Sequence, residues 1–248
     1  MHTYKLTIVY DGTHYGGWQI QPNCITIQAL IIKALSTALR QETYVIGSSR
    51  TDAGVHAKGQ IAHFHTDILL CPHRLLHSLN GLLPADIRVT HLQEVSSSFH
   101  ARYSAERKLY HYHLHLDPVT DPFTKLYSWH VPHPVDLALL QDALPLFLGS
   151  HDFSSFANES HKGAASHDPI RSLSRLALIL EEGGVRLEFE ANGFLYKMVR
   201  NIVGTLMDLC AHKLTLQEIP RIFHAKDRRC AGRTAPAHGL FLMQIYYH

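Results

Sequence analysis

Residues 43–65 read Thr-Tyr-Val-Ile-Gly-Ser-Ser-Arg-Thr-Asp-Ala-Gly-Val-His-Ala-Lys-Gly-Gln-Ile-Ala-His-Phe-His. β-Branched and aromatic residues near both ends predict short strands over Thr43–Ile46 and Gly59–His65. Between them, Gly47–Lys58 is polar and contains turn-forming residues, which predicts a loop. Loops supported by rigid strands often carry binding and catalytic side chains. The acidic residue of this loop, Asp52, is therefore the first candidate for chemistry.

Asp52 has a cation two residues away, Arg50. A positive charge at this distance stabilises an ionised carboxylate, and an ionised carboxylate is what a covalent nucleophile requires. An Asp-Ala-Gly sequence is also typical of an ordinary turn. The spacing alone leaves both interpretations open.

Strands and helices are predicted on both sides of this loop. The strands are Tyr4–Tyr10, Ile87–Val95, 109–116, 173–180, 185–191 and Leu240–Tyr246, and the helices are 27–40, 72–80, 135–148, 195–211 and 215–224. Thr26 is the expected N-cap of the first helix, Asn80-Gly81 predicts a turn, and 156–169 predicts a loop. We expect an α+β fold of two subdomains, 1–105 with the Asp52 loop and 106–248 completing an active-site cleft. Each has a mostly antiparallel sheet with helices on one face.

The composition is that of a globular protein. Of the 248 residues, 46% are hydrophobic and 18% are charged, which argues against disorder. The sequence has no run of 18 apolar residues and no apolar core of a signal peptide near its start, so we expect a cytoplasmic protein without a membrane span. The four cysteines form no CxxC pair, and we expect reduced thiols.

The formal net charge is only +2, but basic residues are concentrated in 197–233. That range has eight basic side chains against three acidic ones: Lys197, Arg200, Lys213, Arg221, Lys226, Arg228, Arg229 and Arg233, against Asp208, Glu218 and Asp227. Such a surface is suited to a phosphate backbone. From the charges alone, solvated helix faces are the favoured interpretation.

Histidine occurs 21 times, which raises the question of a metal site. The clearest cluster is in Leu109–Leu116, where alternation places His111, His113 and His115 on one face of a strand and Tyr110 on the other. The chain contains no HExxH motif. A row of histidines on a solvated face is the favoured interpretation, and we expect no metal.

Arg50-Thr-Asp-Ala-Gly-Val-His56 resembles the catalytic motif of the TruA family of tRNA pseudouridine synthases, and other blocks of that family follow in order. They are Tyr10-Asp-Gly12, Tyr15-Gly-Gly-Trp-Gln-Ile-Gln21, Thr26-Ile-Gln28, Asn80-Gly-Leu-Leu-Pro-Ala-Asp-Ile87, Phe99-His-Ala-Arg-Tyr-Ser-Ala105, Met198-Val-Arg-Asn-Ile-Val-Gly204 and Gly239-Leu-Phe-Leu242. The resemblance covers the length of the chain. One departure is Ser49, where the family usually has glycine.

The resemblance implies a pseudouridine synthase fold and a role for each matching residue. Asp52 matches the catalytic aspartate, Arg50 an arginine beside it that contacts RNA, and Arg200 a basic residue near the pocket. Tyr110 matches the tyrosine that stacks on the target base. Before the resemblance is considered, Tyr110 also fits a core aromatic and Arg200 a helix-flank residue.

The family's chemistry sets the remaining expectations. Uridine becomes pseudouridine at positions 38, 39 and 40 of the tRNA anticodon stem-loop, without a cofactor, in a homodimer that grips one tRNA. We expect Arg102 and Lys197 to bind the RNA, although Arg102 and Arg107 also fit plain surface charges. The alternatives are a synthase with another RNA target, a non-catalytic RNA-binding protein and a histidine-rich metal-dependent hydrolase.

Overall fold

The computed structural model describes residues 1–158 and 168–248, and the chain divides into two compact units. Unit 1 comprises Met1–Glu106 and Phe241–His248, and unit 2 comprises Arg107–Leu240. The sequence prediction placed all of 106–248 in the second unit. The last eight residues return to unit 1 because their strand pairs with a strand of that unit.

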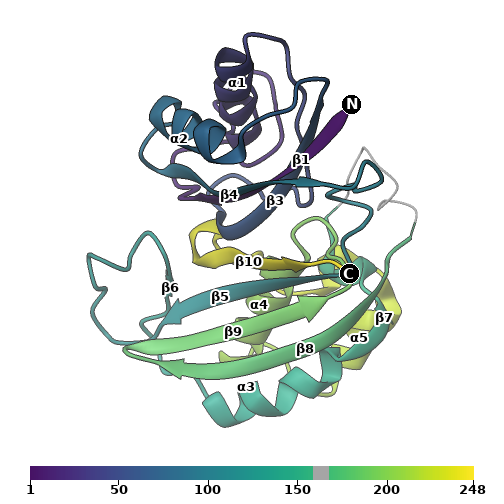
Figure 1. Ribbon diagram of the computed structural model, residues 1–248. Coiled ribbons are helices and arrows are strands. Elements are labelled where there is room, and N and C mark those ends of the chain that lie inside the picture. The colour runs from purple at the N-terminus through teal and green to yellow at the C-terminus, as the bar shows by residue number, and fades with distance from the viewer. Residues whose placement is uncertain (159–167) are drawn as a thin grey trace. The chain divides into compact units, whose positions relative to one another are not determined.

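Unit 1 has helices on one face of a mostly antiparallel sheet (Figure 1). Its elements are β1 (His2–Tyr10), α1 (Ile27–Leu39), β2 (Ile46–Gly47), β3 (His56–Thr66), α2 (Pro72–Leu82), β4 (Ile87–Val95) and β10 (Leu240–Tyr246). The strand order is β4-β1-β3-β10, with β2 also paired to β3. β10 runs parallel to β3, with Phe241 opposite His56, whereas β1 is antiparallel to both of its neighbours.

The core of unit 1 follows from the period of its sequence. On β1, alternate residues from Tyr4 to Tyr10 are buried, as expected for a strand with one face against helices. On α1, Ile27, Ile31 and Leu35 form the buried stripe. Thr26 is the N-cap residue as predicted, but its side chain makes no capping hydrogen bond.

Three predicted boundaries in unit 1 were wrong. The first short strand is Ile46–Gly47 instead of Thr43–Ile46, and β3 begins at His56, three residues earlier than expected. Asn80-Gly81 lies inside α2 and makes no turn there, because the Asn80 side chain donates to the Val89 carbonyl (2.8 Å) and accepts from the Val89 amide (2.9 Å). These long-range bonds outweigh the local turn preference of Asn-Gly.

Unit 2 also has a sheet with helices behind it in the view of Figure 1. Its helices and strands are β5 (Arg107–His115), β6 (Trp129–His130), α3 (Leu137–Ala143), β7 (Gly149–Asp152), β8 (Ile170–Glu181), β9 (Gly184–Ala191), α4 (Met198–Cys210) and α5 (Glu218–Ala225). Its strand order is β5-β9-β8-β7, and these three pairings are antiparallel. The predicted hairpin is confirmed, with its turn between Glu181 and Gly184.

Two predicted helices of unit 2 are shorter than expected. The helix over 135–148 is α3 followed by a 3₁₀ helix, Leu144–Phe147, because Pro145 has no amide hydrogen to continue an α-helix. The helix over 195–211 begins only at Met198, because Lys197 has φ 61°, in the left-handed region. Most of the loop predicted over 156–169 falls outside the described residues.

The α+β class and the mostly antiparallel sheets agree with the predicted fold. Within the described ranges, no helix combines the length and the apolar character that crossing a membrane requires.

Candidate active site

The loop that carries Asp52 is held at Thr51, the residue before it. The Trp18 amide donates to the Thr51 carbonyl (3.0 Å), and the hydroxyls of Tyr10 and Thr51 lie 2.7 Å apart in the protein interior. The Val55 amide donates to the Asp52 carbonyl (3.1 Å), which closes the turn. The backbone around Asp52 is therefore fixed by side chains and by main-chain bonds.

Gly17 allows this close approach. Its φ is +88°, which favours glycine, and a Cβ atom there would lie 2.5 Å from the Thr51 carbonyl oxygen and 2.8 Å from the Asp52 carbonyl carbon. Gly12 behaves similarly, since its Cβ would lie 2.0 Å from the Val55 carbonyl oxygen. The glycine-containing blocks near the N-terminus thus serve the geometry of the Asp52 loop.

The two ends of the loop are fixed as well. Before the motif, the Gln60 side chain brackets Ser49, accepting from its amide (3.2 Å) and donating to its carbonyl (2.8 Å). After the motif, His56 is buried, its Nδ1 lies 3.0 Å from the Gly12 amide nitrogen, and its ring stacks on Phe241 with centroids 4.6 Å apart. Ser49 is therefore held by two hydrogen bonds between its backbone and the Gln60 side chain.

Within this fixed frame, Asp52 is half-buried and Arg50 is exposed. Both belong to unit 1, as does Arg102, in the turn that follows β4. A half-buried aspartate on a fixed backbone, two residues from a solvent-exposed arginine, is suited to act on an anionic polymer that approaches from solvent.

The other candidates lie in unit 2, on β5 and at the start of α4. The Tyr110 ring meets the Phe194 ring edge to face, with centroids 5.1 Å apart. Lys197 is the N-cap residue of α4, and its Nζ lies 5.0 Å from the Tyr196 ring centroid. Its left-handed backbone is costly for a side chain with a Cβ, and such positions are concentrated at functional sites.

Arg200, in the first turn of α4, is tied to the segment that follows α5. Its Nε donates to the Ala235 carbonyl (2.8 Å), and the Ala235 amide donates back to the Arg200 carbonyl (3.0 Å). The next residue, Asn201, is fully buried and accepts from Arg228 (3.0 Å) and Thr234 (2.6 Å). Arg200 is therefore not a loose flank residue but a side chain of defined direction.

The basic range 197–233 is not one continuous cationic surface. Several of its cations lie against carboxylates: Lys213 and Arg233 against Asp208, Lys226 against Asp152, and Arg229 against Asp227. The last contact lowers the pKa of the Asp227 carboxyl to about 2, chiefly through hydrogen bonds from Arg229. Four of the eight cations are thus paired, although Asp208 and Asp227 already count in the net charge of the range, 8 − 3 = +5.

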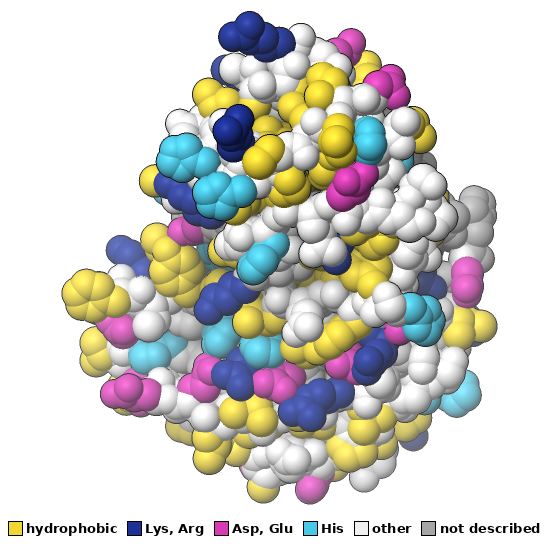
Figure 2. All heavy atoms as spheres, viewed as in Figure 1, with side chains coloured by type: hydrophobic (Ala, Val, Ile, Leu, Met, Phe, Trp, Pro, Cys, Tyr) yellow, Lys and Arg dark blue, Asp and Glu magenta, His cyan; other side chains and the backbone are white. Residues whose placement is uncertain are grey.

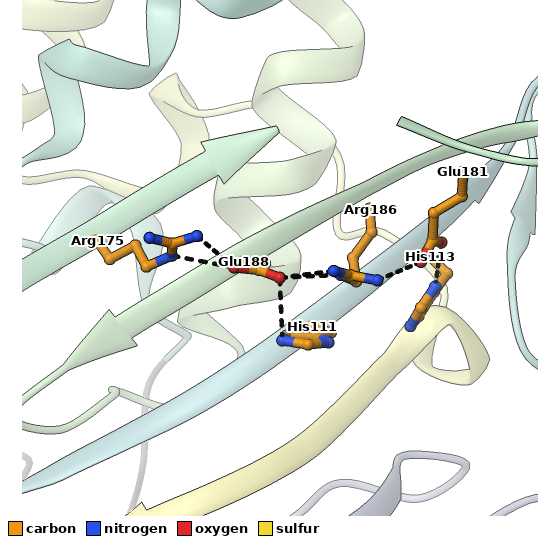
Figure 3. Close-up of polar contacts among 6 residues, drawn as sticks. All are labelled: His111, His113, Arg175, Glu181, Arg186 and Glu188. Atoms are coloured by element: carbon orange, nitrogen blue, oxygen red, sulfur yellow. Dashed lines mark hydrogen bonds and ion pairs between the residues drawn. The ribbon is translucent and has the colours of Figure 1, made fainter. Parts of the chain in front are cut away.

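His111 and His113 of β5 belong to a network of polar contacts on the sheet of unit 2 (Figure 3). Glu188 accepts from Arg175 (2.7 Å) and Arg186 (2.8 Å), and Arg186 also pairs with Glu181. His113 lies 2.7 Å from Glu181. Figure 2 shows basic, acidic and histidine side chains intermixed over this face, so its charge is balanced.

The predicted solvated histidine row needs correction. His111 is largely shielded from solvent, and burial lowers its pKa to about 4. His115 is buried, with Nε2 3.0 Å from the Val119 carbonyl oxygen. Among the residues that the structure describes, no three or more histidine, cysteine, aspartate or glutamate side chains are placed to hold a metal ion.

The family model for tRNA pseudouridine synthase matches residues 7–104 and 143–248, which include the Asp52 loop and α4. The chain belongs to the tRNA pseudouridine synthase family. It is 58% identical over 248 residues to tRNA pseudouridine synthase A 1 of Protochlamydia amoebophila, covering 100% of this chain and 97% of that protein. It is 42% identical over 247 residues to tRNA pseudouridine synthase A of Acetivibrio thermocellus, with 100% of both chains covered.

Membership of the tRNA pseudouridine synthase family confirms the resemblance found from the motifs and makes the chain an isomerase. The family match includes five of the six candidate site residues, while Tyr110 falls in its gap, 105–142. Sequence reasoning missed the residues that hold the loop, Tyr10, Gly17 and Gln60. Gly17 had a signal, because paired glycines before a tryptophan indicate a close backbone approach.

Proposed function

We propose that this chain isomerises uridine to pseudouridine at positions 38, 39 and 40 of the tRNA anticodon stem-loop, as a cytoplasmic homodimer. The coarser statement, isomerisation of uridine in tRNA, rests on the family match and on the named relatives. The observation that carries the proposal is the anchored Asp52 loop, whose backbone is bonded through Thr51 to two residues of the N-terminal segment.

The reaction rearranges one nucleoside. The bond from N1 of the base to C1′ of the ribose breaks, and a bond from C5 to C1′ forms. N1 gains a proton and C5 loses one, so atoms and electrons balance without an external oxidant or reductant. The protein must therefore provide a carboxylate at the ribose and a pocket in which the detached base can rotate, and it must exclude water from that pocket.

Asp52 supplies the carboxylate in this proposal. It either attacks C1′ as a nucleophile or removes a ribose proton, and both routes need the ionised form in a fixed position. Arg50, exposed beside it, contacts the RNA backbone. Arg200, directed by its bonds to Ala235, adds positive charge for the substrate.

Tyr110 supplies the platform for the base. A uridine in a stem must leave the base stack, which costs a few kcal/mol, and stacking on an aromatic ring returns about 1–3 kcal/mol. The Tyr110 side chain is 6% exposed and meets the Phe194 ring edge to face, so in this proposal the base reaches a ring that is buried in the free protein. Arg102 and Lys197 complete the set as RNA-binding cations.

The direct test uses unmodified tRNA transcripts with uridine at positions 38–40, incubated with wild-type protein or with Asp52→Ala, without added metal or nucleotide. We expect pseudouridine at those positions with wild type and none with the variant, which should still bind tRNA. Site-specific chemical detection reads the position. Pseudouridine only at other sites would assign another target, and tRNA binding without any pseudouridine would favour the binding-protein interpretation.

A further inference from the structure

The segment Phe99–Ser104 of unit 1 is a closed and well-bonded turn. The Ser104 amide donates to the His100 carbonyl (2.9 Å), and the His100 amide donates to the Ser104 hydroxyl (3.0 Å). The Ala101 carbonyl accepts from the Tyr247 hydroxyl (2.7 Å), so the C-terminal segment also holds this turn. The backbone here is as constrained as that of the Asp52 loop.

The His100 ring fixes the next two residues. Its Nδ1 lies 3.2 Å from the amide nitrogens of both Arg102 and Tyr103, so it accepts from both and carries no proton itself. Burial, and after it the nearby Arg102 charge, lowers the pKa of His100, which favours the neutral ring. This acceptor therefore holds the backbone of both following residues.

Tyr103 is nevertheless strongly exposed. Its side chain is 77% exposed, although its ring lies against the His100 ring with centroids 4.3 Å apart. The Arg102 guanidinium lies 5.9 Å from the Tyr103 ring centroid. An exposed aromatic ring therefore lies between a histidine ring and an arginine, with its other surface open to solvent.

We propose that Arg102 and Tyr103 form a nucleotide-binding platform: Tyr103 stacks on an unpaired base of the tRNA, and Arg102 pairs with a phosphate. This inference rests on the proposed function and adds a contact outside the Asp52 loop. The sequence from Ser96 to Ala105 contains no carboxylate that would repel a phosphate. An aromatic face combined with an arginine is the usual composition of sites for single-stranded nucleic acid.

The test measures the dissociation constant of the full chain for an unmodified tRNA transcript. Loss of one stacked base predicts that Tyr103→Ala binds roughly 5- to 150-fold more weakly, whereas Tyr103→Phe, which keeps the ring, stays within about twofold of wild type. Arg102→Gln should lower the slope of log affinity against log salt concentration by about one.

Tyr44 offers a matched control. It is 71% exposed in the same unit, but its hydroxyl donates to the Glu42 carboxylate (2.7 Å), and an acidic neighbour disfavours RNA. Tyr44→Ala should leave tRNA affinity unchanged. If Tyr103→Ala binds tRNA as tightly as wild type, the platform proposal is wrong. If that variant also self-associates more weakly than wild type, the Tyr103 ring contacts a second copy of the chain instead. Failure of the proposed function is seen separately, as absence of pseudouridine.

Discussion

Gly17 has no side chain, and this lets its backbone pack directly against the backbone of Thr51 and Asp52. The left-handed backbone there and the short approach to Thr51 bring the N-terminal segment against the Asp52 loop. The sequence indicated Asp52 through its motif, but it did not indicate which distant residues fix the loop. That information needs coordinates, because Gly17 and Thr51 are 34 positions apart in the chain and no periodic pattern links them.

Gly17→Ala should sharply lower kcat while destabilising the fold. The added Cβ would lie 2.5 Å from the Thr51 carbonyl oxygen, so this carbonyl would have to move, and the left-handed φ adds strain. We therefore expect the free energy of unfolding to fall by roughly 1–3 kcal/mol. Urea denaturation and pseudouridine assays measure the two effects.

Gly81→Ala is the matched control for this substitution. Nothing lies within 4 Å of a Cβ at Gly81, which is inside α2, so the change should stabilise the protein by about 0.5–1 kcal/mol and leave activity intact. Equal activity of the Gly17 and Gly81 variants would contradict the role assigned to the loop contact.

At the scale of elements, periodicity predicted nearly every helix and strand, and errors arose where tertiary contacts replaced local preferences. Asn80-Gly81 stays helical because Val89 of β4 provides partners for the Asn80 amide. Helix α4 begins three residues later than predicted because Lys197 adopts a left-handed conformation, which its residue type does not predict. β10 was predicted correctly as a strand, but its parallel pairing with β3 cannot be predicted from a hydrophobic pattern.

Gly204→Ala tests the contact between α4, which carries Arg200, and the segment that carries Ala235. A Cβ at Gly204 would lie 1.7 Å from the Arg233 carbonyl oxygen, so the segment that carries Ala235 must move away from the helix. Arg200 would then lose its carbonyl partner, and we expect lower kcat/KM for tRNA together with a destabilisation of about 1–3 kcal/mol.

A double-mutant cycle with Arg200→Gln identifies the cause of that loss. If Gly204 acts through Arg200, the activity losses of the two substitutions should not add. Full additivity in kcat/KM would show that Gly204 affects activity by a route that does not involve Arg200.

At the scale of the whole molecule, acid should weaken the fold through buried histidines in both units. Burial, reinforced by the neighbouring His100 and His65, lowers the pKa of His63 to about 4, and burial does the same for His111. Below about pH 6.5 the unfolded chain binds more protons than the folded one, so the free energy of unfolding falls as pH drops toward 4. For His63 the change amounts to roughly 3 kcal/mol.

Urea denaturation at pH 7, 5.5 and 4.5 measures this dependence. His63→Gln, whose side chain keeps an acceptor for the Ala101 amide, should show a flatter decline than wild type. His14→Gln, at an exposed position, should reproduce the wild-type slope. Parallel curves for all three proteins would assign the acid sensitivity to other groups.

The return of β10 to unit 1 has a consequence for synthesis of the chain. Proteins made on the ribosome commonly fold from the N-terminus as domains emerge, but the sheet of unit 1 lacks its β10 strand until residues 240–246 have been translated. The strand edge at His56, which follows the Asp52 loop, therefore stays unpaired by β10 until that strand has been made. A nascent chain stalled before residue 240 would carry the whole motif but not the strand that supports it, so the motif gains this support only after β10 is synthesised.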